Sequence, residues 1–201
     1  DLSPATSVYA TMNDGVLPPT LDPRKRAMTL EHLLTMSSGF DCDEEEENSP
    51  GYEDSVTGPD VYRQTLDLPM KRQPGEKAVY CSVGANLVGG VVARAAHERS
   101  VPLFRRLIAD PLGMKRYYLG VTPTHEAYFG GGARLLPRDF LKLAQVHLDG
   151  GKWHGRRVYS ADWSQKATAP HMKFFEESKS RYGYLWWLYD LAYKGPTVRA
   201  Y

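Results

Sequence analysis

The most regular pattern of apolar and polar positions in the chain runs from Ser82 to about His97. Its apolar side chains follow the spacing of one face of an α-helix: Leu87, Val88, Val91, Val92 and Ala95. Glycines interrupt the same stretch, and each costs about 1 kcal/mol against alanine inside a helix: Gly84, Gly89 and Gly90. We therefore predict a buried helix that another segment approaches closely at these glycines.

Shorter elements flank this helix on both sides. Periodicity and capping residues predict short helices around residues 7–12, 29–39, 59–70, 102–109, 137–149 and 162–168. Gly39 and Gly150 are expected to end two of them. Gly130-Gly131-Gly132 predicts a tight backbone approach. Aromatic and β-branched residues predict strands at 182–189 and 197–201.

The composition is typical of a globular protein and excludes several classes of function. Hydrophobic residues make up 42% of the chain, and 25 Lys and Arg nearly balance 24 Asp and Glu. The chain therefore has no strong electrostatic field that would favour binding to nucleic acid or to an anionic membrane. No apolar run is long enough to span a bilayer. The six histidines show no metal-ligand spacing, so we expect neither a metal nor a cofactor.

Two further features receive structural interpretations. Cys42 and Cys81 do not make a disulfide framework, and Cys81 is predicted to be a small packing residue, because no histidine lies near it in sequence to activate its thiol. A dense acidic run is predicted to be a solvated surface loop, since like charges repel: Asp41, Asp43, Glu44, Glu45, Glu46 and Glu47. This run lacks the ligand spacing and central glycine of a calcium loop.

The tripeptide Tyr80-Cys81-Ser82 carries the candidate chemistry, because it lies between the turn at Pro74-Gly75-Glu76 and the long helix. A helix N-terminus presents free N–H groups and partial positive charge that favour a tyrosinate, so a phenol there can move protons. Other segments accompany it in a definite order: residues 29–40, 74–82, 111–114, 130–132, 149–153 and 182–187. Together they resemble the serine β-lactamase and penicillin-binding-protein-like family, in its class C and esterase branch.

The resemblance implies an α+β fold of the β-lactamase/transpeptidase type, with a helical lobe and part of an antiparallel sheet. Residues 1–201 would form a single domain fragment, with helices and loops over 1–180 and sheet strands over 181–201. Tyr80 and Ser82 fall on the family's Tyr-x-Asn motif, which implies that Tyr80 is a proton shuttle and Ser82 a substrate-binding residue. The acidic run would then lie over the rim of the active site.

Aromatic residues late in the chain are further candidates for substrate binding. Trp186 and Trp187, with Tyr184, are expected to line an acyl pocket or to belong to the core of the sheet. The substrate would be a small ester or amide.

The family's other two motifs are missing from the chain. No serine is followed three residues later by lysine, and there is no Lys-Thr-Gly or His-x-Gly sequence. The simplest interpretation is an internal fragment, incomplete at both ends, of a longer protein that carries the nucleophile elsewhere. The absence of a signal peptide then assigns no compartment, and the sequence does not give the oligomeric state.

The sequence therefore predicts part of a serine hydrolase that acts through an acyl-enzyme. Ser82 replaces the usual asparagine, and a hydroxyl offers one donor where an amide offers two. This replacement favours the hydrolysis of carboxylic esters. A β-lactamase or D-Ala-D-Ala carboxypeptidase is the alternative within the same chemistry, and a non-catalytic binding or scaffold protein is the alternative outside it.

Overall fold

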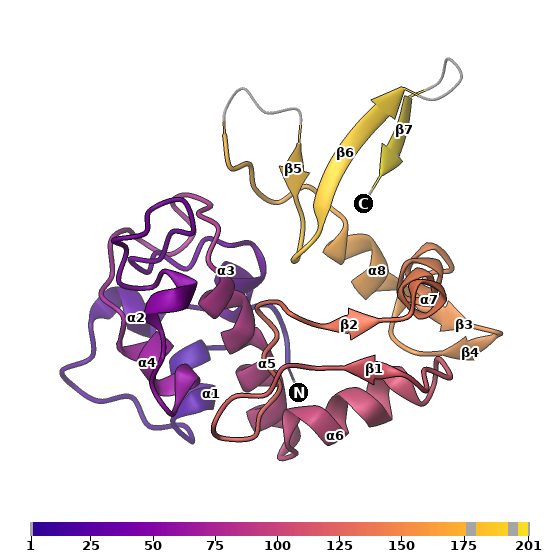
Figure 1. Ribbon diagram of the computed structural model, residues 1–201. Coiled ribbons are helices and arrows are strands. Elements are labelled where there is room, and N and C mark those ends of the chain that lie inside the picture. The colour runs from indigo at the N-terminus through magenta and orange to yellow at the C-terminus, as the bar shows by residue number, and fades with distance from the viewer. Residues whose placement is uncertain (1, 176–179, 193–196, 201) are drawn as a thin grey trace.

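The computed structural model describes residues 2–175, 180–192 and 197–200. Helices dominate the first part of the chain, and short antiparallel strand pairs occur later (Figure 1). The helices are α1 (Val8–Met12), α2 (Pro23–Ala27), α3 (Leu30–Leu34), η1 (Glu53–Ser55), α4 (Val61–Asp67), α5 (Ser82–Ala96), α6 (Ser100–Phe104), η2 (Arg105–Ala109), α7 (Pro137–Leu148) and α8 (Ala161–Ala167). The strands are β1 (Tyr117–Tyr118), β2 (Arg134–Leu135), β3 (Lys152–Trp153), β4 (Arg156–Arg157), β5 (Arg181–Tyr182), β6 (Trp187–Ala192) and β7 (Thr197–Ala200).

The main core lies in the N-terminal helical lobe, around α5. This helix contacts α1, α3, α4 and α6, and its side chains Leu87 and Val91 are completely buried. Met28 and Phe40 belong to the same core cluster. The helix that the sequence predicts from Ser82 to about His97 is thus confirmed.

Other segments approach α5 closely at two of its glycines, as predicted from the presence of glycine inside a helix. A Cβ added at Gly89 would lie 2.0 Å from the Phe129 ring, and one added at Gly90 would lie 3.0 Å from the Tyr62 ring. Fully buried Asn86 fixes the same segment, because its Oδ1 accepts a hydrogen bond of 2.9 Å from the Phe129 N–H group. Gly130 also approaches α5 closely, since an added Cβ would lie 2.6 Å from the Ser82 carbonyl oxygen.

A second, smaller core lies between η2 and α7. Ala109, Leu112, Met114 and Val146 are its buried members. Three large apolar side chains of α7 face solvent: Phe140, Leu141 and Leu148 are 65–67% exposed.

The three-stranded sheet has the order β5-β6-β7 and is antiparallel (Figure 1). The strand predicted over 182–189 is wrong in its extent, because residues 183–186 form a turn between β5 and β6. Tyr184 and Leu185 donate their N–H groups to the carbonyls of Ala167 and Leu34, and therefore to helix ends rather than to a strand. Of the strand predicted over 197–201, β7 covers 197–200, and residue 201 lies outside the described residues.

The helix over 29–39 is also shorter than predicted. It ends at Leu34, before Gly39, because Met36 takes a left-handed conformation with φ of 57°. The N–H group of Ser37 then bonds to the His32 carbonyl and closes the helix.

The contact at Gly89 yields a stability prediction. We expect Gly89→Ala to lower the free energy of unfolding by about 1–2 kcal/mol, because displacing the Phe129 ring outweighs the helix propensity gained. Gly131→Ala is the matched control, since nothing lies within 4 Å of its added Cβ. Urea unfolding measures both, and equal or greater stability of Gly89→Ala would contradict the packing described.

Candidate active site

Tyr80 lies at the N-terminal end of α5 and lines a cavity of about 180 Å³. The cavity is shared with Phe174 and with Trp187, the first residue of β6, so helical lobe and sheet both contribute to it. Tyr80 is 38% exposed, which leaves its phenol accessible from solvent. A small molecule in this cavity would therefore contact the tyrosine side chain.

Aromatic rings form the wall of the cavity on the side of the sheet. The ring centroid of Trp187 lies 6.2 Å from that of Tyr80 and 4.8 Å from that of Phe174, with near-parallel planes in both pairs. Tyr182 packs edge-on against Trp187 at 5.1 Å. Burial raises the pKa of Tyr182 well above its usual range, so this phenol stays neutral behind the wall.

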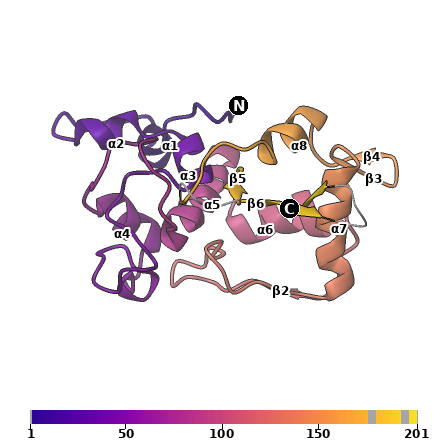
Figure 2. The same cartoon turned by 90° about the horizontal axis from the view of Figure 1, so that it is seen from above.

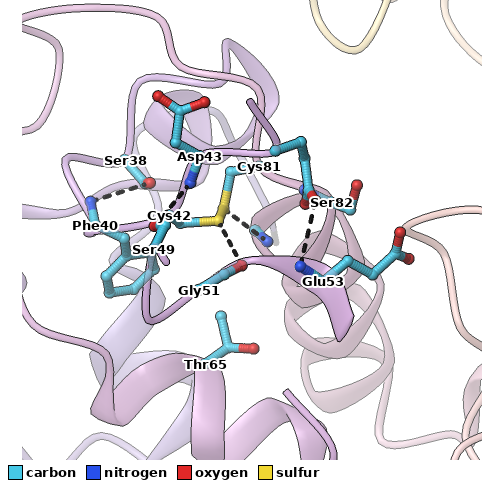
Figure 3. Close-up of a disulfide and its surroundings, with 12 residues drawn as sticks. Ser38, Phe40, Cys42, Asp43, Ser49, Gly51, Glu53, Thr65, Cys81 and Ser82 are labelled. Atoms are coloured by element: carbon cyan, nitrogen blue, oxygen red, sulfur yellow. Dashed lines mark hydrogen bonds between the residues drawn. A yellow bond between two sulfur atoms is a disulfide. The ribbon is translucent and has the colours of Figure 1, made fainter. Parts of the chain in front are cut away.

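A disulfide joins Cys42 to Cys81, with Cα atoms 5.5 Å apart (Figure 3), and Cys81 directly follows Tyr80 in the chain. The expectation that the two cysteines form no disulfide framework is therefore wrong, although Cys81 is buried as predicted for a packing residue. The chain places position 42 next to position 81 through backbone contacts at Phe40 and Met70, which form a bridge, and at Glu44, whose N–H donates to the Tyr80 carbonyl. Both half-cystines are buried.

Glu44 also departs from the solvated loop predicted for the acidic run. Its Oε1 accepts a hydrogen bond of 2.9 Å from the Ser82 N–H group at the start of α5. Its Oε2 accepts a second one of 3.2 Å from the Glu53 N–H group. Glu44 is half-buried, whereas Glu45, Glu46 and Glu47 are exposed as predicted.

Two N–H groups at the start of α5, those of Ser82 and Gly84, therefore have hydrogen-bond partners within the protein. Cys81 is the N-cap, and its Sγ accepts a weak hydrogen bond from the Gly84 N–H group at 3.3 Å. The Glu44 carboxylate occupies the Ser82 N–H group and adds negative charge at the helix end. Glu44 therefore offsets part of the positive charge that a helix terminus provides.

The other predicted site residues divide between the cavity and its surroundings. Trp187 lines the cavity together with Tyr80, whereas Ser82 and Trp186 are not among its lining residues. Ser82 is 6% exposed, and Trp186 packs against His147 of α7 with ring centroids 5.0 Å apart. Their substrate-binding roles remain predictions. Tyr184 is buried, and its hydroxyl donates to Glu31 at 2.6 Å.

Two residues of the site escaped the sequence analysis. Phe174 carried no motif, and its contact with Trp187 depends on the fold alone. Glu44 was treated as one of a run of carboxylates, and nothing in the run distinguishes it. Within the described residues, no three His, Cys, Asp or Glu side chains gather to hold a metal ion, and no helix has the length and apolarity to cross a membrane.

The chain matches a known protein family and is similar to many solved structures. The family model named Beta-lactamase matches residues 6–200. No curated protein sequence matches the chain.

Similar solved structures include the octameric penicillin-binding protein homologue from Pyrococcus abyssi, with a TM-score of 0.69 and 20% identity over 94% of this chain and 48% of that one. The D-stereospecific amidohydrolase from Streptomyces sp. has a TM-score of 0.70 and 16% identity over 100% of this chain and 67% of that one. EstCE1, a hydrolase with promiscuous acyltransferase activity, has a TM-score of 0.69 and 15% identity over 94% and 63%. The chain spans only 48–52% of the length of several such structures.

The disulfide yields a prediction about stability. We expect reduction to lower the free energy of unfolding by about 2–5 kcal/mol, since it releases a constraint on the unfolded chain. A Cys42→Ala/Cys81→Ala double variant should show no further response to dithiothreitol. Peptide mapping without reductant should recover the Cys42 and Cys81 peptides as one linked species, and alkylation of both thiols under those conditions would exclude the disulfide.

Proposed function

Because the chain belongs to the beta-lactamase family, we propose that it is part of a serine hydrolase that cleaves small carboxylic esters through an acyl-enzyme. The observation that supports this function most directly is the position of Tyr80. Its partly exposed phenol lines a cavity at the junction of helical lobe and sheet, next to the start of a buried helix.

Acyl transfer by a serine requires a base for the hydroxyl, donors for the oxyanion and groups that hold the substrate. We assign the proton transfer to Tyr80. A phenol has an unperturbed pKa near 10, so a tyrosine base needs ammonium groups beside it, and the α5 terminus does not supply them. The lysine of a Ser-x-x-Lys motif would provide such a charge.

The nucleophile is proposed to lie in a segment outside the 201 residues. No serine in the chain has a lysine three residues later, and the chain spans about half the length of several similar structures. The cavity at Tyr80 would then be completed by residues that the chain itself does not contain. Trp187 and Phe174 are placed to contact the acyl group of a substrate.

The preference for esters is inferred from Ser82. A serine hydroxyl at this position supplies one donor, whereas asparagine supplies two donors and an acceptor for a substrate amide. Ser82 is also nearly covered, which limits direct contact with a substrate. Esters need fewer hydrogen bonds to the group beside the scissile bond than amides do, so they suit this site better.

Removal of the Tyr80 hydroxyl tests the mechanism in the complete hydrolase. We expect Tyr80→Phe to lower kcat roughly 10²- to 10⁴-fold for ester and β-lactam substrates alike, as for other positioned acid-base groups. Tyr118→Phe is the matched control, because Tyr118 is 57% exposed on β1 and does not line the cavity. Similar kcat/KM values for wild type and Tyr80→Phe would remove Tyr80 from the mechanism and favour a scaffold protein.

Substitution at Ser82 tests the substrate preference. The wild-type hydrolase should turn over short-chain esters better than cephalosporins, and Ser82→Asn should shift the ratio of kcat/KM values toward the cephalosporin by up to roughly tenfold, the worth of one hydrogen bond. Ser82→Ala should leave the preference for esters in place. A wild-type preference for the β-lactam would refute the ester assignment.

A further inference from the structure

We propose that Glu44 is a positioning residue for Tyr80: it holds the backbone on both sides of Cys81 and thereby fixes where the phenol enters the cavity. This inference rests on the function proposed for Tyr80 and adds the residue that orients it. Glu44 belongs to the acidic run, whose other glutamates are exposed.

Glu44 makes two hydrogen bonds to the tripeptide Tyr80-Cys81-Ser82, one through its backbone and one through its side chain. Its N–H group donates to the Tyr80 carbonyl at 3.0 Å, and its Oε1 accepts from the Ser82 N–H group at 2.9 Å. The disulfide from Cys42 holds Cys81 between these two points. The three links join residues 42–44 to residues 80–82.

A further hydrogen bond holds the Glu44 carboxylate in place. The Glu53 N–H group donates to Glu44 Oε2 at 3.2 Å, and the Glu53 carboxylate accepts a hydrogen bond from the Tyr128 hydroxyl. Figure 3 shows Glu53 and Ser82 on the same side of the disulfide. Hydrogen bonds to a carboxylate are stronger than those between neutral groups, so this arrangement gives the Glu44 side chain a defined place.

The Tyr80 ring is held less firmly than its backbone. It is 38% exposed, and its centroid lies 6.1 Å from that of Phe174 and 6.2 Å from that of Trp187. The direction in which the phenol leaves the chain is therefore determined mainly by the backbone of residues 80–82. Reaction rates respond steeply to small displacements of a catalytic group, so the bonds made by Glu44 should be visible in kcat.

Glu47 provides a matched control for Glu44. It lies three positions later in the same acidic run, carries the same charge and is exposed. Glu46 is less suitable, because its carboxylate pairs with Lys71 at 2.8 Å. A general effect of negative charge in the acidic run would appear in both Glu44 and Glu47 variants, whereas positioning would appear in Glu44 variants alone.

The experiment measures ester hydrolysis by the complete hydrolase in two backgrounds, wild type and Tyr80→Phe. With Tyr80 present, Glu44→Ala should lower kcat about ten- to a hundredfold with KM changed by no more than about twofold. Glu44→Gln, which keeps an acceptor oxygen for the Ser82 N–H group, should recover most of the loss. Glu47→Ala should match wild type, and Glu44→Ala should cause no further loss in Tyr80→Phe.

Equal losses from Glu44→Ala in both backgrounds, or an unchanged kcat with Tyr80 present, would overturn the proposal. Amide hydrogen exchange supplies a second measurement that needs no activity. The Ser82 and Glu53 amides should exchange faster in Glu44→Ala and not in Glu47→Ala, and unaltered exchange at Ser82 would also overturn it. An inactive wild-type hydrolase with the expected exchange would instead refute the function proposed for Tyr80 and leave the contacts of Glu44 established.

Discussion

Phe129 occupies the space that any side chain larger than glycine would need at position 89 of α5, and the Tyr62 ring leaves little room at position 90. The same buried helix also packs against α1, α3 and α6, and it binds the segment after β1 through Asn86. Figure 2 shows α5 between the N-terminal helices and the elements that follow it. The first turn of this helix therefore lies where helical lobe and sheet meet, and Tyr80 reaches the cavity for that reason.

The long helix could be predicted because its signal is local, whereas the fold class was implied by the resemblance to the family. The apolar spacing of Leu87 and Val91 specified a buried helix, and the glycines in the same stretch implied a close neighbour without identifying it. The ordered motifs implied the family. The position of Tyr80 near the start of α5 followed from both.

The remaining features depend on contacts between distant residues. No local pattern reveals that Cys42 meets Cys81, because their pairing arises from the path of the chain through Phe40 and Met70. Similarly, Glu44 accepts a hydrogen bond at the start of α5 from 38 residues away, while Glu45, Glu46 and Glu47 are exposed. The turn at 183–186 interrupts a pattern typical of a strand because helix ends supply its hydrogen-bond partners.

The covalent link between Cys42 and Cys81 closes a ring with a sequence separation of 39. This ring contains the exposed glutamates at 45–47 and helix α4, and Tyr80 lies just inside its end. A protease that cleaves once within the acidic run would therefore open the ring without releasing a fragment. The two pieces would stay joined beside the cavity, and the nicked chain would keep its mass except for the water added at the cut.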